Sequence, residues 1–344
     1  MRSQQVVRAL AAIRPDLRIH VRTTAPEWIF HNTITPIHYS RQAIDSGIVQ
    51  SDSLHMELAE TLAACRAIYA NPQKLIDQEL AFVKANGIDL IVADTPPIAF
   101  EIAAQAGVPS VSITNFTWDV IYRAYVEAFP EFAPLIGTMT QCYGKTTHAL
   151  TLPYPCDTAM FPRQQRIPWI ARSSELTKTQ ARQAFALPQT ATIVLLSFGG
   201  LGLDHLPWNQ MARQREYVFV MTGTGHRRES NLLTLPATQT RYQDLLRAAD
   251  AIVTKPGYGI VADVLAQQVP ILYTDRGDFA EYPQLVAALH DCATTEFIPQ
   301  QELLRGNLSP YLSRLLAKPP HWPDIELNGA QVAAQKILSM LDPA

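Results

Sequence analysis

Two glycines and a lysine stand where a strand gives way to a helix in the second half of the chain. The short apolar run 251–253 is typical of a buried strand, and Lys255-Pro256-Gly257-Tyr258-Gly259 ends it. Glycines let the backbone turn tightly and approach a ligand, and the free N–H groups of a following helix face the same place. The pattern predicts a phosphate-binding turn. A helix N-terminus without any ligand has the same pattern, so both interpretations stand at this point.

Charged side chains near this turn have the chemistry for the same ligand. Lys255 would add a full positive charge beside a phosphate, and Asp263, in the first turn of the helix, would accept hydrogen bonds from sugar hydroxyls. The helix is expected to begin near Ile260, and the apolar run 270–273 is expected to form the next strand. A connection this short predicts a right-handed parallel βαβ unit.

A carboxylate in the first half of the chain follows another apolar run. The predicted strand 88–93 ends at Asp94, and open parallel sheets bind ligands at the C-terminal ends of their strands. Asp94 could equally cap the helix that is predicted over 97–106. Trp118 lies in the polar and aromatic loop 115–119, where it could stack on a ring or simply pack.

Length and composition limit the classes of protein to which the chain can belong. At 344 residues it exceeds the size at which one hydrophobic core usually stops growing, so two domains are expected. Hydrophobic residues make up 47% and charged residues 17%, which is typical of a globular protein. The net charge of −3 gives no reason to expect a nucleic-acid partner.

The sequence also indicates in which cellular compartment the protein is expected. No apolar stretch is long enough for a membrane-spanning helix, and the N-terminus does not have the pattern of a signal peptide, so a cytoplasmic protein without a membrane span is expected. Its 4 cysteines have no paired spacing, so they are expected to be reduced and mostly buried.

Periodicity predicts alternating helices and strands throughout the first half. The expected elements are helix 6–13, strand 18–22, a polar loop over 31–53, helices 54–69 and 72–86, strand 88–93, helix 97–106, strand 109–114, interrupted helices over 120–147, and strand 149–152. An α/β domain that opens on a helix lacks the strand that would normally lie at its centre. The first domain is therefore expected to lack its first strand.

A cluster of prolines over 153–168 predicts a linker between two domains. The second half is expected to contain helix 177–185, strands 191–198 and 217–221, helix 241–249, the turn described above, helix 281–290, strand 292–294, a helix beginning at 300–304 and a closing helix over 329–341. The predicted boundaries are 1–165 for the first domain, 166–328 for the second, and 329–344 for the closing helix.

Several stretches together give the sequence a resemblance to GT-B glycosyltransferases. It is most similar to glycosyltransferase-like proteins related to the N-terminal part of plant arabinose kinases, and more broadly to UDP-sugar glycosyltransferases. The stretches that carry the resemblance are 45–54, 114–119, 197–200, 255–262 and 273–283. The resemblance implies an α/β fold of two Rossmann-like domains that face each other across a cleft.

The resemblance also implies a nucleotide-sugar donor site in the second domain. Its expected members lie at the diphosphate, at the ribose and at the donor sugar. They are Gly199, Gly200, Gly257, Tyr258 and Gly259 at the diphosphate, with Lys255 beside them, Asp263 at the ribose, and Asp278 and Glu281 at the sugar. Two positions depart from the family: Lys255 replaces a histidine, and Tyr282 stands where a donor-binding glutamine is usual.

The largest departure from the family concerns the acceptor side. Relatives begin with a first strand and a glycine–histidine loop, and in many transferases that histidine is the general base for the acceptor hydroxyl. This sequence has no counterpart of the loop. Asp94 resembles the aspartate that orients such a histidine, so it is the expected catalytic residue of an incomplete pair.

The function implied by the resemblance is glycosyl transfer from a nucleotide sugar to an unknown acceptor hydroxyl. No cofactor is expected, and because there is no Asp-X-Asp sequence, no divalent metal is expected either. An alternative is a non-catalytic module that binds a sugar nucleotide or a partner. A third interpretation is a nonhydrolysing sugar-nucleotide epimerase, which shares the fold but needs carboxylates around the sugar that the sequence does not identify.

Overall fold

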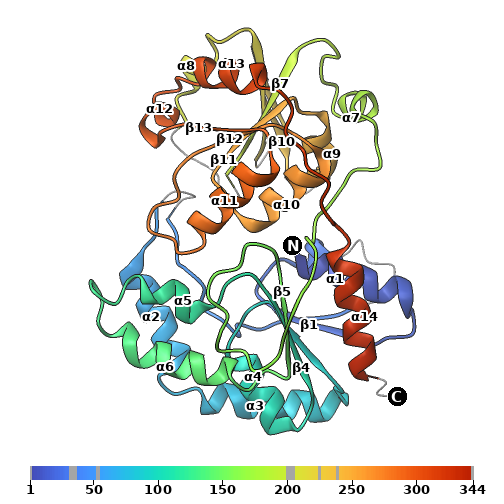
Figure 1. Ribbon diagram of the computed structural model, residues 1–344, viewed down its shortest axis with the longest axis vertical. Coiled ribbons are helices and arrows are strands. Elements are labelled where there is room, and N and C mark those ends of the chain that lie inside the picture. The colour runs from blue at the N-terminus through green and yellow to red at the C-terminus, as the bar shows by residue number, and fades with distance from the viewer. Residues whose placement is uncertain are drawn as a thin grey trace.

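The computed structural model describes residues 2–30, 37–51, 55–198, 206–223, 226–237 and 240–341. It consists of two α/β halves, one above the other in Figure 1, and each half is built on parallel strands flanked by helices. The chain crosses from one half to the other through the linker and crosses back through its last helix.

The first half contains two separate parallel sheets. Strand β1 (Ile19–Thr23) pairs with β2 (Ile37–Arg41), while a second, 4-stranded sheet has the order β3-β4-β5-β6. The bounds of the latter are Ile91–Ala93 for β3, Ser110–Thr114 for β4, His148–Thr151 for β5 and Gln164–Arg166 for β6. Buried residues fill β4, so the centre of this sheet lies there.

Two strands of the first half were not predicted. The loop predicted over 31–53 contains β2, and the proline-rich linker predicted over 153–168 contains β6. Both strands lie at sheet edges and carry mostly polar residues (IHYSR and QQR), so neither has the apolar run or the alternation that identifies a strand. Residues 31–36 of the predicted loop lie outside the described residues.

The helices of the first half follow the apolar periodicity closely. They are α1 (Arg2–Ile13), the short 3-10 helix η1 (Glu27–Phe30), α2 (Leu58–Tyr69), α3 (Gln73–Asn86), α4 (Ile98–Ala106), α5 (Trp118–Arg123) and α6 (Phe132–Tyr143). Helix α3 ends at Gly87, whose φ of 57° is left-handed and therefore favours glycine. The predicted end of this helix at residue 86 is confirmed.

The second half is organised around one 7-stranded sheet in the order β13-β12-β11-β7-β8-β10-β9, in which only the β9–β10 pair is antiparallel. The strands are β7 (Thr192–Ser197), β8 (Tyr217–Gly223), β9 (Arg227–Glu229), β10 (Leu232–Pro236), β11 (Ala251–Thr254), β12 (Ile271–Tyr273) and β13 (Thr295–Phe297). Strand β11, which precedes the glycine turn, is buried at every position and lies inside the sheet between β12 and β7.

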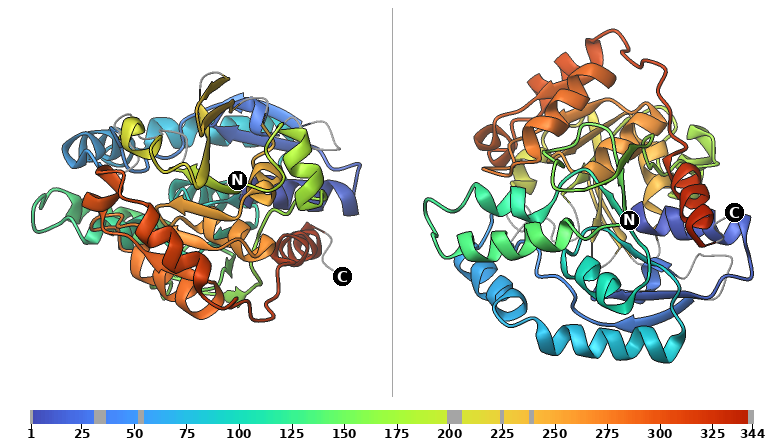
Figure 2. Two further views of the ribbon diagram at one scale, coloured as in Figure 1. Left: turned by 90° about the horizontal axis from the view of Figure 1, so that it is seen from above. Right: turned by 60° about the horizontal axis from the view of Figure 1, so that its bottom comes forward.

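The helices of the second half cover both faces of this sheet (Figures 1 and 2). They are α7 (Lys178–Ala184), α8 (Trp208–Met211), α9 (Tyr242–Ala248), α10 (Tyr258–Gln267), α11 (Tyr282–Cys292), α12 (Gln300–Leu304) and α13 (Ser309–Ala317). Helix α10 begins at Tyr258, two residues before the expected position, so the glycine turn is shorter than predicted and part of it is helix.

The closing helix α14 (Gly329–Leu341) returns to the first half and packs beside α1 (Figures 1 and 2). Its buried residues Ala333, Ala334 and Ile337 share a hydrophobic cluster with Val6 and Leu10 of α1. Since the same cluster includes residues of the second half, α14 helps to join the two halves.

Replacing Gly329 with alanine is expected to lower the free energy of unfolding by roughly 1–3 kcal/mol, the usual cost of overpacking. A Cβ atom at this position would lie 2.1 Å from the backbone oxygen of Pro168. Urea unfolding measures the effect. The control is Gly137→Ala in α6, where a Cβ atom meets nothing within 4 Å. Equal urea midpoints for the two variants would contradict the described contact between α14 and the linker.

All four cysteines are buried, and none forms a disulfide. Burial raises the pKa of the Cys65 thiol to about 12, so this thiol is protonated at neutral pH. Among the described residues, no helix combines the length and the apolarity that crossing a bilayer requires.

Candidate functional site

The N-terminus of α10 is open. Gly257 occupies the N-cap position, and no side chain caps the helix there. A Cβ atom built on Gly257 or on Gly259 would meet no atom within 4 Å, so there is room for a ligand group beside each of these two residues. The first N–H groups of a helix have no partner within the helix, and they carry its positive dipole end. This end of α10 can therefore bind an anion.

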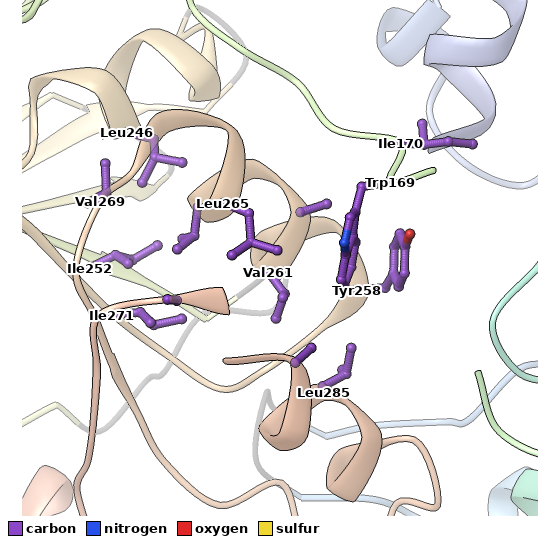
Figure 3. Packing of buried hydrophobic residues seen from close by; sticks show 14 of the residues in the cluster. Trp169, Ile170, Leu246, Ile252, Tyr258, Val261, Leu265, Val269, Ile271 and Leu285 are labelled. Carbon is purple, nitrogen blue, oxygen red and sulfur yellow. The ribbon is translucent and has the colours of Figure 1, made fainter. Parts of the chain in front are cut away.

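Strand β11 and the packing of α10 fix this helix end in place. The hydroxyl of Thr254, the last residue of β11, donates hydrogen bonds to the backbone oxygens of Ser197 at the end of β7 and of Lys255. Behind the first turn, Val261 and Leu265 of α10 are buried against the sheet (Figure 3). The turn is thus anchored from two neighbouring strands, and its open side is not needed for packing.

Tyr258 packs its ring instead of offering it to a ligand. The ring stacks on Trp169, which lies between β6 and α7 (Figure 3), and the two ring centroids are 4.9 Å apart. Its hydroxyl group is buried beside the backbone of Ile170, and burial raises the pKa of Tyr258 well above its ordinary value. The hydroxyl is therefore neutral, and the backbone N–H of Tyr258 belongs to the helix end that can bind an anion.

Asp263 is bound by Arg172, which lies in the segment between β6 and α7. Its carboxylate accepts hydrogen bonds from the backbone N–H of Arg172 at 2.8 Å and from Nε of Arg172 at 2.9 Å, and it also pairs with a terminal nitrogen of the same guanidinium. Burial raises the pKa of Asp263, and the charge of Arg172 offsets only part of this effect. A ribose hydroxyl could reach this carboxylate only if the contact with Arg172 opened.

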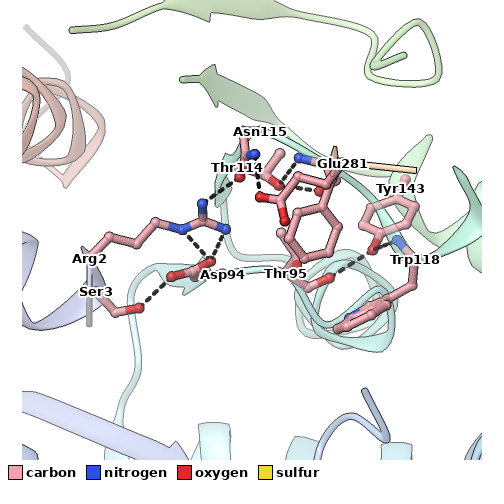
Figure 4. A network of polar contacts seen from close by, with 10 residues as sticks. Arg2, Ser3, Asp94, Thr95, Thr114, Asn115, Trp118, Tyr143 and Glu281 are labelled. Carbon is pink, nitrogen blue, oxygen red and sulfur yellow. Dashed lines mark hydrogen bonds and ion pairs between the residues drawn. The ribbon is translucent and has the colours of Figure 1, made fainter. Parts of the chain in front are cut away.

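Asp94, at the end of β3, forms an ion pair with the first helix. Arg2 of α1 donates to Oδ1 of Asp94 from Nε at 2.8 Å, and the Ser3 hydroxyl donates to Oδ2 at 2.6 Å (Figure 4). Burial alone would raise the pKa of Asp94, but the charge of Arg2 and these hydrogen bonds outweigh it, so the pKa lies below its ordinary value. Helix α4 has no side-chain cap, so the alternative role of Asp94 as its cap is wrong.

Arg2 also links this carboxylate to the second half of the protein. Its guanidinium donates to the side-chain oxygen of Asn115 at 2.6 Å and lies 5.2 Å from the ring centroid of Tyr258 in α10. Asn115 in turn donates to Glu281 at 2.7 Å, as Figure 4 shows. The two halves therefore meet in one continuous polar network.

Glu281 connects this network to the turn before α10. Its second oxygen accepts a hydrogen bond from Arg276 at 2.7 Å, and Arg276 also donates to the backbone oxygen of Pro256 at 3.3 Å. The Nε of Arg276 is buried and has no partner in the structure. Asp278, in the same segment, is exposed. A second guanidinium thus lies beside the glycine turn.

Asp45 is a second carboxylate with a shifted pKa in the first half. It accepts a hydrogen bond from the backbone N–H of Ser46 at 2.9 Å, and the hydroxyl of Tyr69 lies 3.5 Å away. Burial raises the pKa of Asp45 to about 7, and these hydrogen bonds offset only part of the shift. Asp45 and the ionised Asp94 line the same cavity.

Replacing Asp45 with asparagine is expected to change how stability depends on pH. The pKa is about 7 in the folded protein and 3.8 in the reference state, so the folded protein retains a proton that the unfolded chain loses between these values. Relative to the variant, the free energy of unfolding of the wild type should therefore fall by up to about 1.4 kcal/mol for each unit by which the pH rises from 3.8 to about 7. Urea unfolding at pH 5 and pH 7.5 measures this difference. A constant difference between the two proteins would contradict it.

The aromatic loop after β4 packs within the first half. Trp118 stacks on Tyr122 with centroids 5.5 Å apart and meets Phe116 edge to face at 5.2 Å. These contacts favour packing over ligand stacking for Trp118.

The structure brings some of the predicted site residues together and leaves others apart. Gly257, Gly259 and Glu281 lie around the turn before α10 or in the network attached to it, and Asp94 lies in the same network. Lys255 is partly buried within the turn itself. Gly199 and Gly200 lie outside the described residues.

Four residues of the site were not predicted: Arg2, Asn115, Arg172 and Arg276. Asn115 follows directly after β4, and Arg276 follows closely after β12, so the strand-end argument used for Asp94 could have found both. Arg2 and Arg172 have no such local signal. Arg2 is the first residue of α1, and Arg172 lies in the segment between β6 and α7.

Solved structures of glycosyltransferases are similar to the whole chain. The glycotransferase of kitacinnamycin has a TM-score of 0.65 at 15% identity, covering 99% of this chain and 95% of that one. The calicheamicin glycosyltransferase CalG4 has a TM-score of 0.59 at 15% identity, covering 99% and 91%. UGT2 of Phytolacca americana, complexed with UDP-2fluoro-glucose and pterostilbene, has a TM-score of 0.59 at 10% identity, covering 98% and 90%. The chain has the GT-B fold of two Rossmann-like domains.

One curated protein matches the sequence. The L-arabinokinase of Arabidopsis thaliana is 28% identical over 340 residues, which are 96% of this chain but 32% of that protein. The chain thus spans about a third of the length of this relative. No family model matches the sequence.

Proposed function

We propose that the protein binds a nucleoside-diphosphate sugar at the N-terminus of α10 and transfers its glycosyl group to an acceptor hydroxyl. The open helix end carries this proposal, because no side chain caps it and a Cβ atom at Gly257 or Gly259 would meet no atom within 4 Å. The GT-B fold supports the proposal, and one similar structure contains UDP-2fluoro-glucose.

In this proposal the diphosphate lies against the backbone of Gly257, Tyr258 and Gly259. The helix dipole, together with the nearby charges of Lys255 and Arg276, stabilises the diphosphate as it leaves with the electron pair of the broken bond to the anomeric carbon. The acceptor oxygen forms the new bond to that carbon, and its proton passes to a base.

The network of Asp94 and Arg2 lies on the side of α10 that faces the first half, where the acceptor would bind. Asp94 is ionised, as a base must be, although Arg2 and Ser3 engage both of its oxygens. We assign Asp94 to the acceptor proton, with Arg2 and Ser3 holding the carboxylate in place. Asp263, tied to Arg172, takes part in ribose binding only after that contact shifts.

The engagement of Asp94 favours a second candidate function, a sugar-nucleotide-binding module without catalysis. A carboxylate whose two oxygens already accept charged or hydroxyl donors is a poor base unless a bound acceptor displaces one of them. Both candidates use the same donor site, so nucleotide binding does not separate them. Turnover does.

A thermal-shift screen with UDP, dTDP, GDP and their sugars tests the donor site. A ligand at a hundred times its dissociation constant should stabilise the protein by ~2.7 kcal/mol. If none of these nucleotides moves the melting temperature, the donor-site proposal is wrong for both candidate functions.

For the transferase, Asp94→Asn is expected to lower turnover by roughly 10²-fold or more while leaving the nucleotide dissociation constant unchanged, because the amide cannot accept the acceptor proton. Release of the nucleotide from its sugar measures turnover, and calorimetry measures binding. The control is Glu101→Gln, which removes a remote carboxylate that pairs with Lys145 near the surface. Normal turnover in Asp94→Asn would show that Asp94 is not the base, and no turnover in the wild type would favour the binding module.

A further inference from the structure

A short segment of the second half, residues 276–281 between β12 and α11, is attached to the first half. The ring of Phe279 is buried in a hydrophobic cluster whose other buried members all belong to the first half, and Ala280 packs against the same cluster. Asn115, directly after β4, donates a hydrogen bond to Oε1 of Glu281 at 2.7 Å (Figure 4). The end of this segment is therefore fixed on the first half.

Glu281 is a carboxylate whose two oxygens are both engaged. Oε1 accepts the hydrogen bond from Asn115, and Oε2 accepts a hydrogen bond from Nη1 of Arg276 at 2.7 Å. The residue is only 2% exposed. Because Glu281 is buried under these two donors, a ligand gains access to it only when one of them moves away.

The two donors to Glu281 are held differently. Asn115 is fully buried, and its backbone oxygen accepts a hydrogen bond from the backbone N–H of Cys156 at 2.7 Å. The side chain of Arg276 is 18% exposed, and its hydrogen bond to the backbone oxygen of Pro256 is long, at 3.3 Å. The Nε of Arg276 is buried and has no acceptor among the described residues. An unpaired buried donor is costly, so Arg276 is the donor that gains from a change of partner.

The open end of α10 offers Arg276 a place for such a partner. Pro256 directly precedes Gly257, the N-cap residue of α10, so the guanidinium lies beside the open helix end. A diphosphate at that end carries more negative charge than one carboxylate, and its oxygens suit the bidentate hydrogen bonding of a guanidinium. When the guanidinium turns to the diphosphate, Oε2 of Glu281 loses its donor, while Asn115 still holds Oε1.

We propose that Arg276 is a switch between Glu281 and the diphosphate, and that Glu281 becomes available to the donor sugar only after the diphosphate has bound. This inference rests on the proposed donor site. A glycosyl group bonded to the terminal phosphate lies next to the released Oε2, which accepts a hydrogen bond from one of its hydroxyls. Asn115 is a positioning residue, because it keeps the carboxylate in place while Arg276 leaves. The donor is thus recognised in order, diphosphate first and sugar second.

Calorimetry of the wild type and of Glu281→Gln tests the switch. The probes are UDP, dTDP and GDP, each alone and carrying glucose, galactose or xylose. Glutamine can still accept the hydrogen bond from Asn115, but it cannot form an ion pair with Arg276. The variant should therefore bind the bare nucleotide roughly fivefold more tightly, since no carboxylate competes for the guanidinium. A misfolded variant cannot produce tighter binding.

The sugar should respond in the opposite direction. The wild type should bind at least one nucleotide sugar about tenfold more tightly than the bare nucleotide, because a hydrogen bond to a charged acceptor is a strong one. Glu281→Gln should lose most of this advantage. Retention of the full advantage, or a wild type that prefers none of the sugars, would show that Glu281 is not released to the sugar and would overturn the proposal.

Asp157→Asn is the control for a general effect of charge. Asp157 is exposed and follows Cys156, whose thiol donates to the backbone oxygen of Ala280, so the variant removes a negative charge near the segment without touching Arg276. Its affinities should stay unchanged. Equal tightening in Asp157→Asn, or no tightening in Glu281→Gln, would overturn the switch and leave the donor site standing. If the wild type binds none of these ligands, the donor site and the switch are both wrong.

Discussion

A Gly257→Leu variant is expected to lose all stabilisation by a nucleotide while its unliganded form stays folded. A Cβ atom at Gly257 meets no atom within 4 Å, and its φ of −144° is extended backbone that any residue adopts, so leucine fits. The added side chain fills the space in which the diphosphate would lie. The wild type should gain ~2.7 kcal/mol at a hundred times the dissociation constant, and the variant should gain none. Melting curves with and without nucleotide measure both.

The control for this variant is Gly137→Leu in α6, where a Cβ atom also meets nothing within 4 Å. That variant should keep the full nucleotide-dependent shift. The unliganded Gly257→Leu protein should lose no more than about 1 kcal/mol, since leucine is a poorer N-cap residue than glycine. A full shift in Gly257→Leu would place the nucleotide somewhere other than α10.

Arg172→Met is expected to lower the free energy of unfolding by about 3–5 kcal/mol, the cost of leaving a buried charge without its partner. Asp263 is only 1% exposed and receives the backbone N–H and the guanidinium of Arg172. Adding Asp263→Asn to this variant should recover part of the loss, because an amide needs no counter-charge. Urea unfolding of the two variants measures the effect.

An exposed ion pair provides the control for this stability prediction. Arg305 pairs with Glu302 at 2.8 Å, and its side chain is 69% exposed. Arg305→Met should therefore change the free energy of unfolding by less than about 1 kcal/mol. If Arg172→Met lowers the free energy of unfolding by no more than Arg305→Met does, the contact between Arg172 and Asp263 does not stabilise the second half.

The central unit of the fold could be predicted from local sequence. Strand β11, the glycine turn, α10 and β12 follow one another as expected, because a buried parallel strand has a continuous apolar run and a buried helix has apolar residues at helical spacing. Strands β2 and β6 could not be predicted in the same way. Both lie at sheet edges, where a strand pairs with only one neighbour and its solvent-facing positions carry polar residues.

The partners of the site residues could not be predicted because they are distant in the sequence. Arg2 and Asp94 are 92 residues apart, and Asn115 and Glu281 are 166 apart. Nothing in the sequence around Asp94 indicates which cation holds it. The resemblance to glycosyltransferases implies a place for Asp94 at the acceptor side next to a histidine, whereas in the structure its partner is Arg2 of α1.

A crystal structure of the protein with a nucleoside diphosphate tests the central claim most directly. The claim predicts phosphate oxygens within hydrogen-bond distance of the backbone N–H groups of Tyr258 and Gly259, with Arg276 on the same side of the turn. A diphosphate bound elsewhere, with the first turn of α10 still empty, would contradict it.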